Sequence, residues 1–323
     1  MKKAFKLISM AFIALTVSAG FVACSSDDDD QPESGSGINQ ELATPTYEAD
    51  AALYNITSAN SDYRSIELTA AGNYVVVMDY GYYGAPARKA GVFRKSAIVS
   101  SRAYNNGIIE GTFTKTGDNT YNLKGFGTIT VTGNGGTAVD LDITLEDGTD
   151  VNVTAARKNQ KPDSMMTNNL CRTWEFERLR YTIKINNRVM FDKEVDVNNM
   201  RELYLALANA GALDDDEEID WDDFEEEMEY MAERVIFTKA GTYLVEYRNS
   251  SLAISTWSWI NENAGTLRYS WDYDDMEDDD YAGNVVVSFP GNNRMKIAES
   301  YYDYDDEDGE SYNETITWTL KQA

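Results

Sequence analysis

The residues with the clearest chemical potential are acidic, and they gather in three stretches of the C-terminal half. Residues 214–229, 272–280 and 303–310 hold 12, 7 and 6 carboxylates respectively, and no Lys or Arg interrupts any stretch. Carboxylate oxygens are the ligands that a hard cation such as Ca²⁺ prefers. The sequence therefore predicts a Ca²⁺ site between the second and third stretches. Its candidate ligands are Asp274, Asp278, Asp280, Asp303, Asp305 and Glu307.

The same carboxylates support a second interpretation, a solvated acidic rim that keeps a surface protein soluble. The chain has a formal net charge of −27 and no histidine. Such an excess of acid repels phosphate backbones, which excludes nucleic acid as a partner. The absence of histidine excludes Ser-His-Asp, Cys-His and His-ligated zinc mechanisms. No catalytic residue is assigned, and no cofactor other than Ca²⁺ is expected.

Short alternating strands, with turn residues every ~8–12 positions, predict a mainly β protein built from antiparallel meanders that form sandwiches or barrels. The polar segment 159–169 has one Pro and no apolar periodicity, so it is interpreted as a linker. It separates an N-terminal β domain, residues 45–158, from a C-terminal β domain, residues 170–323.

The two domains repeat one another. Residues 68–77 (LTAAGNYVVV) and 237–246 (FTKAGTYLVE) share Thr, Ala, Gly and Tyr, and each predicts a hairpin with Gly at its turn. Further on, residues 111–121 align in spacing with 257–267, and both domains close on an alternating strand that ends in Lys. Three matches in one order indicate a tandem of related folds.

A helical insertion, residues 198–234, interrupts the second domain. Asn198 and Asn199 are suitable N-caps for a helix that Gly211 ends. A second helix is expected from Asp220 to about Arg234. The apolar residues at helical spacing are Met200, Leu203, Tyr204 and Leu207 in the first helix and Trp221, Phe224, Met228 and Met231 in the second.

An up-and-down meander places alternate reversals at the same end of a barrel. On that basis the tight turns at Asn186, Gly241, Asn261 and Pro290 are expected at one end. The insertion and the two acidic loops at residues 272–280 and 303–310 are expected at the other, where they would form one acidic rim.

The N-terminus has the features of an export signal. Three lysines precede an apolar run, and Phe21-Val22-Ala23-Cys24 resembles a bacterial lipobox in which Cys24 is lipidated, with Phe21 where the family usually has Leu. The resemblance implies that residues 1–23 are a signal peptide and that lipid on Cys24 anchors the protein to a membrane. Residues 24–44 form an acidic, Gly/Ser-containing tether.

The Ser/Asp run after Cys24 resembles the tag that directs Bacteroidetes lipoproteins to the outer face of the outer membrane. In the second domain, Trp174 and the Gly-x-Tyr hairpin before Trp257-x-Trp259 resemble the lipocalin-like domains of such lipoproteins. The resemblance covers residues 166–323 and, more loosely, 45–158. It implies a surface-exposed, non-enzymatic protein with lipocalin-like domains that binds a small molecule, a glycan or a protein.

Two other functions fit some of these residues. Many Bacteroidetes fimbrial subunits also carry a lipobox and two β domains, so a structural or adhesive role is an alternative, although residues 315–321 are expected to close their own domain. A glycoside hydrolase needs only a carboxylate pair ~5–10 Å apart, and acids are abundant. Low-complexity acidic runs are nevertheless poor material for it, because neighbouring carboxylates titrate together.

Two smaller features remain. Cys171 is interpreted as a small buried hydrophobe and has no assigned role. Asp163-Ser164-Met165 resembles the three-residue O-glycosylation site of Bacteroidetes surface proteins, and a plain turn is the competing interpretation.

Overall fold

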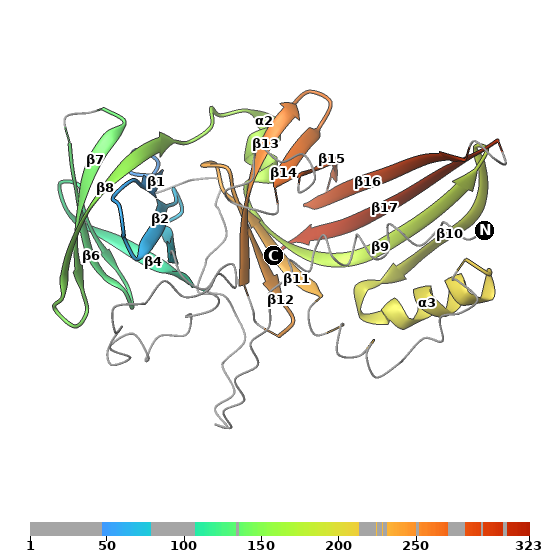
Figure 1. Cartoon of the computed structure of the whole chain (residues 1–323), viewed down its shortest axis with the longest axis horizontal. Helices are drawn as coiled ribbons and strands as arrows, with labels where there is room; N and C mark the ends of the chain where they lie inside the picture. The colour runs from blue at the N-terminus through green and yellow to red at the C-terminus, as the bar shows by residue number, and fades with distance from the viewer. Residues whose placement is uncertain are drawn as a thin grey trace, which may run out of the picture.

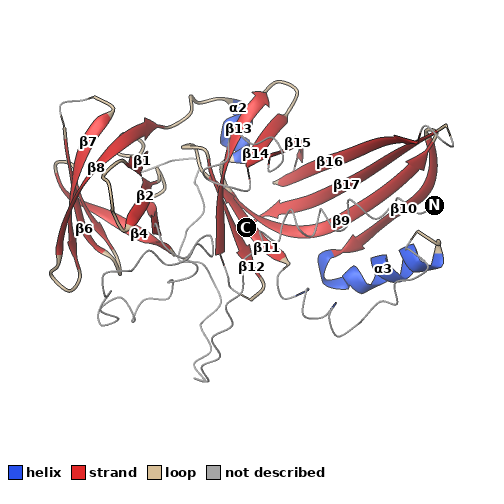
Figure 2. Ribbon diagram, in the orientation of Figure 1, coloured by secondary structure: helices blue, strands red, loops and turns tan. Residues whose placement is uncertain are grey.

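The first domain is a closed eight-stranded antiparallel barrel (Figures 1 and 2). The structure is a computed structural model that describes residues 47–78, 107–133, 136–212, 224, 228, 231–249, 252–270, 282–291, 293–305 and 309–323. Each strand pairs with its neighbours in sequence, and β1 pairs with β8 to close the barrel. The strands are β1 (Ala52–Ile56), β2 (Tyr63–Leu68), β3 (Asn73–Met78), β4 (Ile108–Gly117), β5 (Thr120–Leu123), β6 (Gly127–Thr132), β7 (Ala138–Leu145) and β8 (Asp150–Asn159).

The second domain is also a closed antiparallel barrel, in which β9 pairs with both β11 and β17. One further strand, β10, pairs with β9 beside β11 and does not belong to the barrel wall. The prediction of a mainly β chain with two tandem antiparallel meander domains is therefore confirmed, and both domains are barrels rather than sandwiches. The strands are β9 (Thr173–Ile185), β10 (Arg188–Asp196), β11 (Ala232–Phe237), β12 (Thr242–Tyr247), β13 (Leu252–Asn261), β14 (Thr266–Ser270), β15 (Ala282–Gly291), β16 (Arg294–Asp305) and β17 (Glu310–Gln322).

The repeated hairpins have the same hydrogen bonds in both barrels. The Thr69 hydroxyl accepts from the backbone N–H of Asn73 at 3.1 Å, and the Thr238 hydroxyl accepts from that of Thr242 at 3.2 Å. The glycine of each turn has positive φ, +90° for Gly72 and +96° for Gly241, which only glycine adopts readily. The two hairpins are thus one motif used twice.

The second match in the repeat is shifted by two residues from the predicted alignment. The carbonyl of Gly72 accepts from the N–H of Phe113, and the carbonyl of Gly241 accepts from that of Trp257, both at 2.8 Å. Phe113 is therefore the counterpart of Trp257. The sequence spacing predicts Gly111 as the counterpart of Trp257. The error arose because the sequence match rested on a turn, and turn lengths differ between the two barrels.

The barrels pack together through equivalent outer faces. Counted from the shared hairpin and from the Phe113–Trp257 match, Val75 corresponds to Leu244 and Ile108 to Leu252, and all four are buried in one cluster. Beside this cluster, buried Glu67 of β2 interacts with the side chains of Thr238 and Thr242 across the interface. The complete apolar cluster is Val75, Val77, Ile108, Ile236, Leu244, Leu252 and Ile254.

Helix α3 (Met200–Asn209) is the first predicted helix of the insertion, and its buried residues are three of those expected: Met200, Leu203 and Leu207. Its N-cap, Asn199, makes no side-chain capping bond. Phe224 and Met228 are helical and pack against the same core. The expected end of the second helix near Arg234 is wrong, because β11 begins at Ala232. The insertion predicted for residues 198–234 therefore stops short of its expected end.

The segment predicted to be a plain linker contains a short helix, α2 (Met165–Leu170). Its last residue, Leu170, is fully buried and accepts a hydrogen bond on its carbonyl from the Trp174 indole at 2.9 Å. Cys171, which follows, is buried and forms no disulfide, in agreement with the prediction of a small buried side chain. This segment therefore packs onto the second barrel.

The long strands of the second barrel continue past it as a four-stranded sheet in the order β16-β17-β9-β10, which we call the wing. It consists of β10 and residues 178–185, 299–305 and 310–317, and Figure 1 shows α3 lying along it. The Asn186 turn lies at the tip of the wing, where the Asn186 N–H donates to the carbonyl of Ser311 at 2.8 Å.

This position corrects one part of the threading. Asn186 was expected at the opposite end from the reversal after Tyr304, but the two reversals are neighbours, because β10 is an extra strand outside the barrel wall. The other reversals follow the prediction. The turns at Gly241 and Asn261 and the reversal between Gly291 and Arg294 lie at the α2 end. Ser270 and Ala282, which flank the acidic segment 272–280, lie at the opposite end, as do Asp305 and Glu310 of the segment 303–310.

Candidate functional site

The inner face of β16 becomes partly exposed beyond the point where its pairing with β15 ends. The pairing of β16 with β15 runs from Arg294 to Ala298, while β15 continues to pair with β14. Of the inward-facing residues of β16, Met295 is 0% exposed, but Ile297, Glu299 and Tyr301 are each half-buried. A half-buried carboxylate therefore lies inside the barrel, at the junction with the wing.

Glu299 is held by a tyrosine of β14, two strands away in the barrel wall. The Tyr269 hydroxyl donates to Oε1 of Glu299 at 3.0 Å. Burial raises the pKa of the Glu299 carboxyl above its usual range, and the bond from Tyr269 opposes that rise. Burial likewise raises the pKa of Tyr269, with the Glu299 charge adding to it. A carboxylate in these surroundings is costly to ionise unless a further partner compensates its charge.

Two more hydroxyl-bearing residues adjoin this pair. Tyr243 of β12 is buried, and the neighbouring hydroxyl of Tyr247 and the Glu299 charge both add to the effect of burial in raising its pKa. Ser255 pairs with Tyr243 across β12 and β13, so both side chains are on the inner face. Ser255 is 2% exposed, and its hydroxyl has no hydrogen-bond partner within the described part of the chain.

A second glutamate–tyrosine pair lies under α3. The Tyr181 hydroxyl donates to Oε2 of Glu314 at 3.0 Å, and Glu314 is 2% exposed. Glu314 pairs with Tyr301, and Glu299 pairs with Ile316, so both glutamates are on the inner face as diagonal neighbours. Only Glu299 of the two is accessible to solvent.

The predicted Ca²⁺ ligands fall mostly outside the described residues. Asp274, Asp278, Asp280 and Glu307 lie beyond them, and Asp303 and Asp305 are on β16, although the description does not extend to their side chains. No group of three or more metal-ligating side chains occurs within the residue ranges that the structure describes. The Ca²⁺ site therefore stays a prediction. Cys24 and the segments 1–23 and 24–44 also lie outside the described residues.

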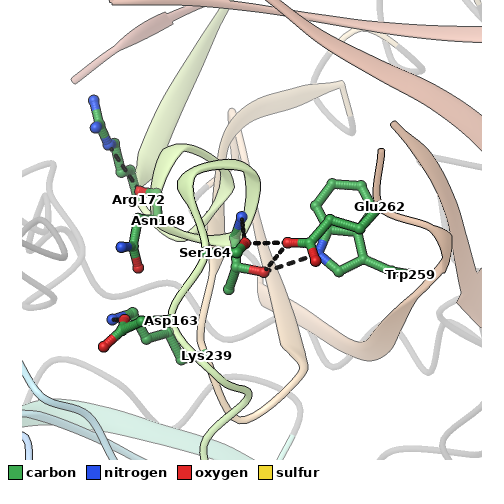
Figure 3. A network of polar contacts seen from close by, with 8 residues as sticks. Asp163, Ser164, Asn168, Arg172, Lys239, Trp259 and Glu262 are labelled. Carbon is green, nitrogen blue, oxygen red and sulfur yellow. Dashed lines mark hydrogen bonds and ion pairs between the residues drawn. The ribbon is translucent and has the colours of Figure 1, made fainter. Parts of the chain in front are cut away.

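A different polar network joins α2 to the second barrel (Figure 3). The Ser164 hydroxyl accepts from the N–H of Thr167 at 2.9 Å and donates to Glu262, which also accepts from the Thr167 hydroxyl. The Trp259 indole donates to that same Thr167 hydroxyl at 2.9 Å. Ser164 is thus a helix N-cap rather than part of a plain turn, and its hydroxyl is occupied by two contacts.

The adjacent Asp163 completes the attachment of α2, since it accepts a bond from Lys239 at 2.6 Å. That contact is the main cause of the lowered pKa of the Asp163 carboxyl. The side chains of this network bond to one another and fix the geometry of the α2 end. Trp257 and Trp259 meet edge-to-face with ring centroids 5.6 Å apart.

Comparisons with known proteins leave the family open. No protein-family model matches the chain, and no curated protein matches it. Among solved structures, it is matched to a mutant of Transferrin Binding Protein B, a vaccine antigen from Haemophilus parasuis Hp5, at 9% identity and a TM-score of 0.18. The match covers 80% of this chain and spans about half of that one (53%). Across the described residues, no helix has the length and apolarity needed to cross a membrane.

Sequence reasoning missed Glu299 and Glu314, although a signal was present. Glu299 alternates with Met295, Ile297 and Tyr301, and Glu314 alternates with Ile316, so both carboxylates occupy inward positions of apolar strands. An acidic residue at an inward position of an apolar strand is a better marker of a binding site than an acidic residue within a run of charged residues.

Proposed function

We propose that this protein is a non-enzymatic binding protein, anchored through lipid on Cys24 to the outer face of an outer membrane, and that its second barrel binds a small molecule at Glu299. The observation that carries the binding proposal is a solvent-accessible carboxylate inside a tyrosine-lined barrel. Barrel interiors with a few polar groups on apolar walls are the usual form of small-molecule sites.

The opposite end of the barrel supports this assignment because it is filled. Trp174 is 1% exposed, bonds to the carboxyl end of α2 and packs on Phe289 with ring centroids 6.1 Å apart. Met295 closes the same region from β16. A barrel that is packed at one end and partly open at the other has the form of a lipocalin-like cup, with Glu299 at its opening.

A carboxylate-pair hydrolase is less well supported. The two acids of such an enzyme must both face the bond that they cleave. Glu314 is 2% exposed and is held by Tyr181 beneath α3, so a sugar that contacts Glu299 does not reach it. An adhesive role through strand donation has no supporting observation either, since residues 315–321 belong to β17, which pairs on both sides.

The anchoring proposal rests on the lipobox and the Ser/Asp run, and the cation-assisted part rests on the acidic segments. Replacing Cys24 by Ala tests the anchor. The wild-type protein should incorporate labelled fatty acid and sediment with membranes, and Cys24→Ala should do neither. Membrane attachment that survives Cys24→Ala would contradict the proposal.

The binding proposal is tested by cysteine accessibility in the soluble protein that begins at Ser25, whose remaining thiol, Cys171, is buried. Glu299→Cys should react readily with a small methanethiosulfonate reagent. Met295→Cys is the matched control, since it lies on the same strand and the same face but is fully buried. If Glu299→Cys in the folded protein is as unreactive as Met295→Cys, the interior is closed and the proposed site does not exist.

A further inference from the structure

Within the described part of the chain, the Glu299 carboxylate has no ion pair with a Lys or Arg. Tyr269 is its one hydrogen-bond donor among these residues, and that bond uses Oε1, which leaves Oε2 without a hydrogen bond to them. Burial raises the pKa of its carboxyl and this bond opposes the rise, and no Lys or Arg of the described residues contributes. The groups that face it are the hydroxyls of Tyr243 and Tyr269 and, one diagonal away, the buried carboxyl of Glu314.

The basic residues of the neighbouring strands point the other way. Arg178 and Arg180 of β9 lie on the outer face, where they pair with Glu194 and Asp192 of β10 at 3.3 and 2.5 Å. Lys296 of β16 is exposed on the outer face as well. Basic residues therefore occur on strands close to Glu299, but strand alternation places their side chains on the outer face, away from it. The charge inside the described part of the barrel is left uncompensated.

The walls around this carboxylate are aromatic. Tyr269 pairs with Trp257 across β13 and β14, and Tyr243 packs on Phe237 with ring centroids 4.9 Å apart. Aromatic faces attract ammonium groups through their quadrupoles, and the attraction is stronger where water is excluded. The free hydroxyl of Ser255, on the same inner face, adds a hydrogen-bonding group beside the rings.

We propose that the Glu299 site binds an organic cation, a small molecule that places an alkylammonium or quaternary ammonium group between the Glu299 carboxylate and the rings of Tyr269 and Tyr243. This inference rests on the proposed function and adds the chemical class of the ligand. The ligand charge compensates the buried carboxylate, and its alkyl groups contact the rings. The net charge of −22 on residues 164–323 attracts such ligands before they bind.

A pair of isosteres tests the inference. Choline and tetramethylammonium are titrated into the soluble protein, with 3,3-dimethylbutan-1-ol as the uncharged isostere of choline. Binding is followed by tryptophan fluorescence and calorimetry at physiological salt. Choline should bind at least about tenfold more tightly than the alcohol, because the charge is the recognised feature.

Two variants locate the effect. Glu299→Gln keeps the shape of the side chain and the bond from Tyr269, and should weaken choline binding by about tenfold or more while leaving the alcohol unchanged. Asp118→Asn removes one charge from an exposed turn of the first barrel and should change nothing. Circular dichroism spectra that match the wild type establish that both variants fold.

The outcomes separate this inference from the proposed function. Equal affinity for choline and the alcohol would overturn the organic-cation inference while leaving a small-molecule site in place. The same conclusion follows if neither cation binds although Glu299→Cys reacts with the thiol reagent. An unreactive Glu299→Cys together with no binding would overturn both proposals. Choline binding that is unaffected in Glu299→Gln would refute the location of the site.

Discussion

The packing of the two barrels predicts that a substitution in the first will be detected by fluorescence from the second. Ile108, on β4 of the first barrel, is 0% exposed and lies in the apolar cluster with Leu244, Leu252 and Ile254 of the second. All six tryptophans of the chain lie beyond residue 170, so tryptophan fluorescence reports on the second domain alone. Ile108→Ala therefore changes the first barrel, and its effect is measured by the tryptophan fluorescence of the second.

The magnitude follows from the atoms removed. Ile108→Ala deletes three buried carbons, worth about 2.5 kcal/mol at ~0.8 kcal/mol each, and the remaining cavity brings the cost to about 3–4 kcal/mol. Burial of the seven side chains of the interface is worth at most about 10–20 kcal/mol. That upper limit is comparable to the total stability of a domain, about 5–15 kcal/mol. The barrels should therefore unfold as one unit.

The assay is urea unfolding of the soluble protein, followed by tryptophan fluorescence and by far-ultraviolet circular dichroism. The two signals should coincide in the wild type, and Ile108→Ala should move both midpoints down together. Thr114→Ala, on the exposed face of the same strand, is the control and should leave them unchanged. A fluorescence midpoint that stays fixed in Ile108→Ala, while circular dichroism shows a separate earlier phase, would refute the coupling.

Three further predictions follow. Gly265→Ala should destabilise the fold by more than ~1–3 kcal/mol in urea melts, because φ is +69° and the added Cβ would collide with the carbonyl of Val287. Gly211→Ala is the control: its φ is +63°, but a Cβ there meets open space, so it should reduce the free energy of unfolding by less. Equal losses in the two variants would contradict this. Burial raises the folded-state pKa of Glu67, so the free energy of unfolding should fall as pH rises from the usual Glu pKa towards the folded-state value. Glu67→Gln should flatten that slope and increase stability at neutral pH. An unchanged slope in melts across that pH range would count against this prediction. Millimolar Ca²⁺ should raise the melting temperature and EDTA should reverse the rise, and the absence of any shift would remove the Ca²⁺ prediction.

The architecture was largely predictable because its signals are local. The hairpins at Gly72 and Gly241 need positive φ at one residue, and that requirement is visible in the sequence. Strand alternation and tight turns then define a meander. The order of the strands around the second barrel was less accessible, since nothing local shows that β10 leaves the wall. That one strand moved the Asn186 turn to the opposite end.

The helix boundaries show where two periodicities overlap. Phe224, Met228 and Met231 fit a helical face, but Val235 and Phe237 fit the inner face of a strand, and Met231 lies between the patterns. Pairing of β11 with β9 decides the boundary, and that contact joins residues far apart in sequence. Helix α2 was missed because six residues are too few to show a period.

The candidate site could be predicted only in part. The inward position of Glu299 follows from alternation along β16. Its partner Tyr269 is contributed by β14, two strands away, and the two meet across the curved inner face of the barrel. The solvent accessibility of Glu299 depends on where β15 leaves β16, which no single segment encodes. The number of acidic residues indicates a site in the charged segments, whereas the candidate site is formed by one acid, Glu299, among apolar residues.

The central claim is that Glu299 is a partly exposed carboxylate on the inner face of the second barrel and has no cationic partner among the described residues. It is tested most directly by the titration of its side-chain carboxyl carbon, followed by NMR in carbon-13 glutamate-labelled protein and assigned through Glu299→Gln. In the free protein the pKa of Glu299 should lie above the usual Glu range, and saturating tetramethylammonium should lower it. An ordinary pKa in the free protein, or one that tetramethylammonium leaves unchanged, would contradict the account.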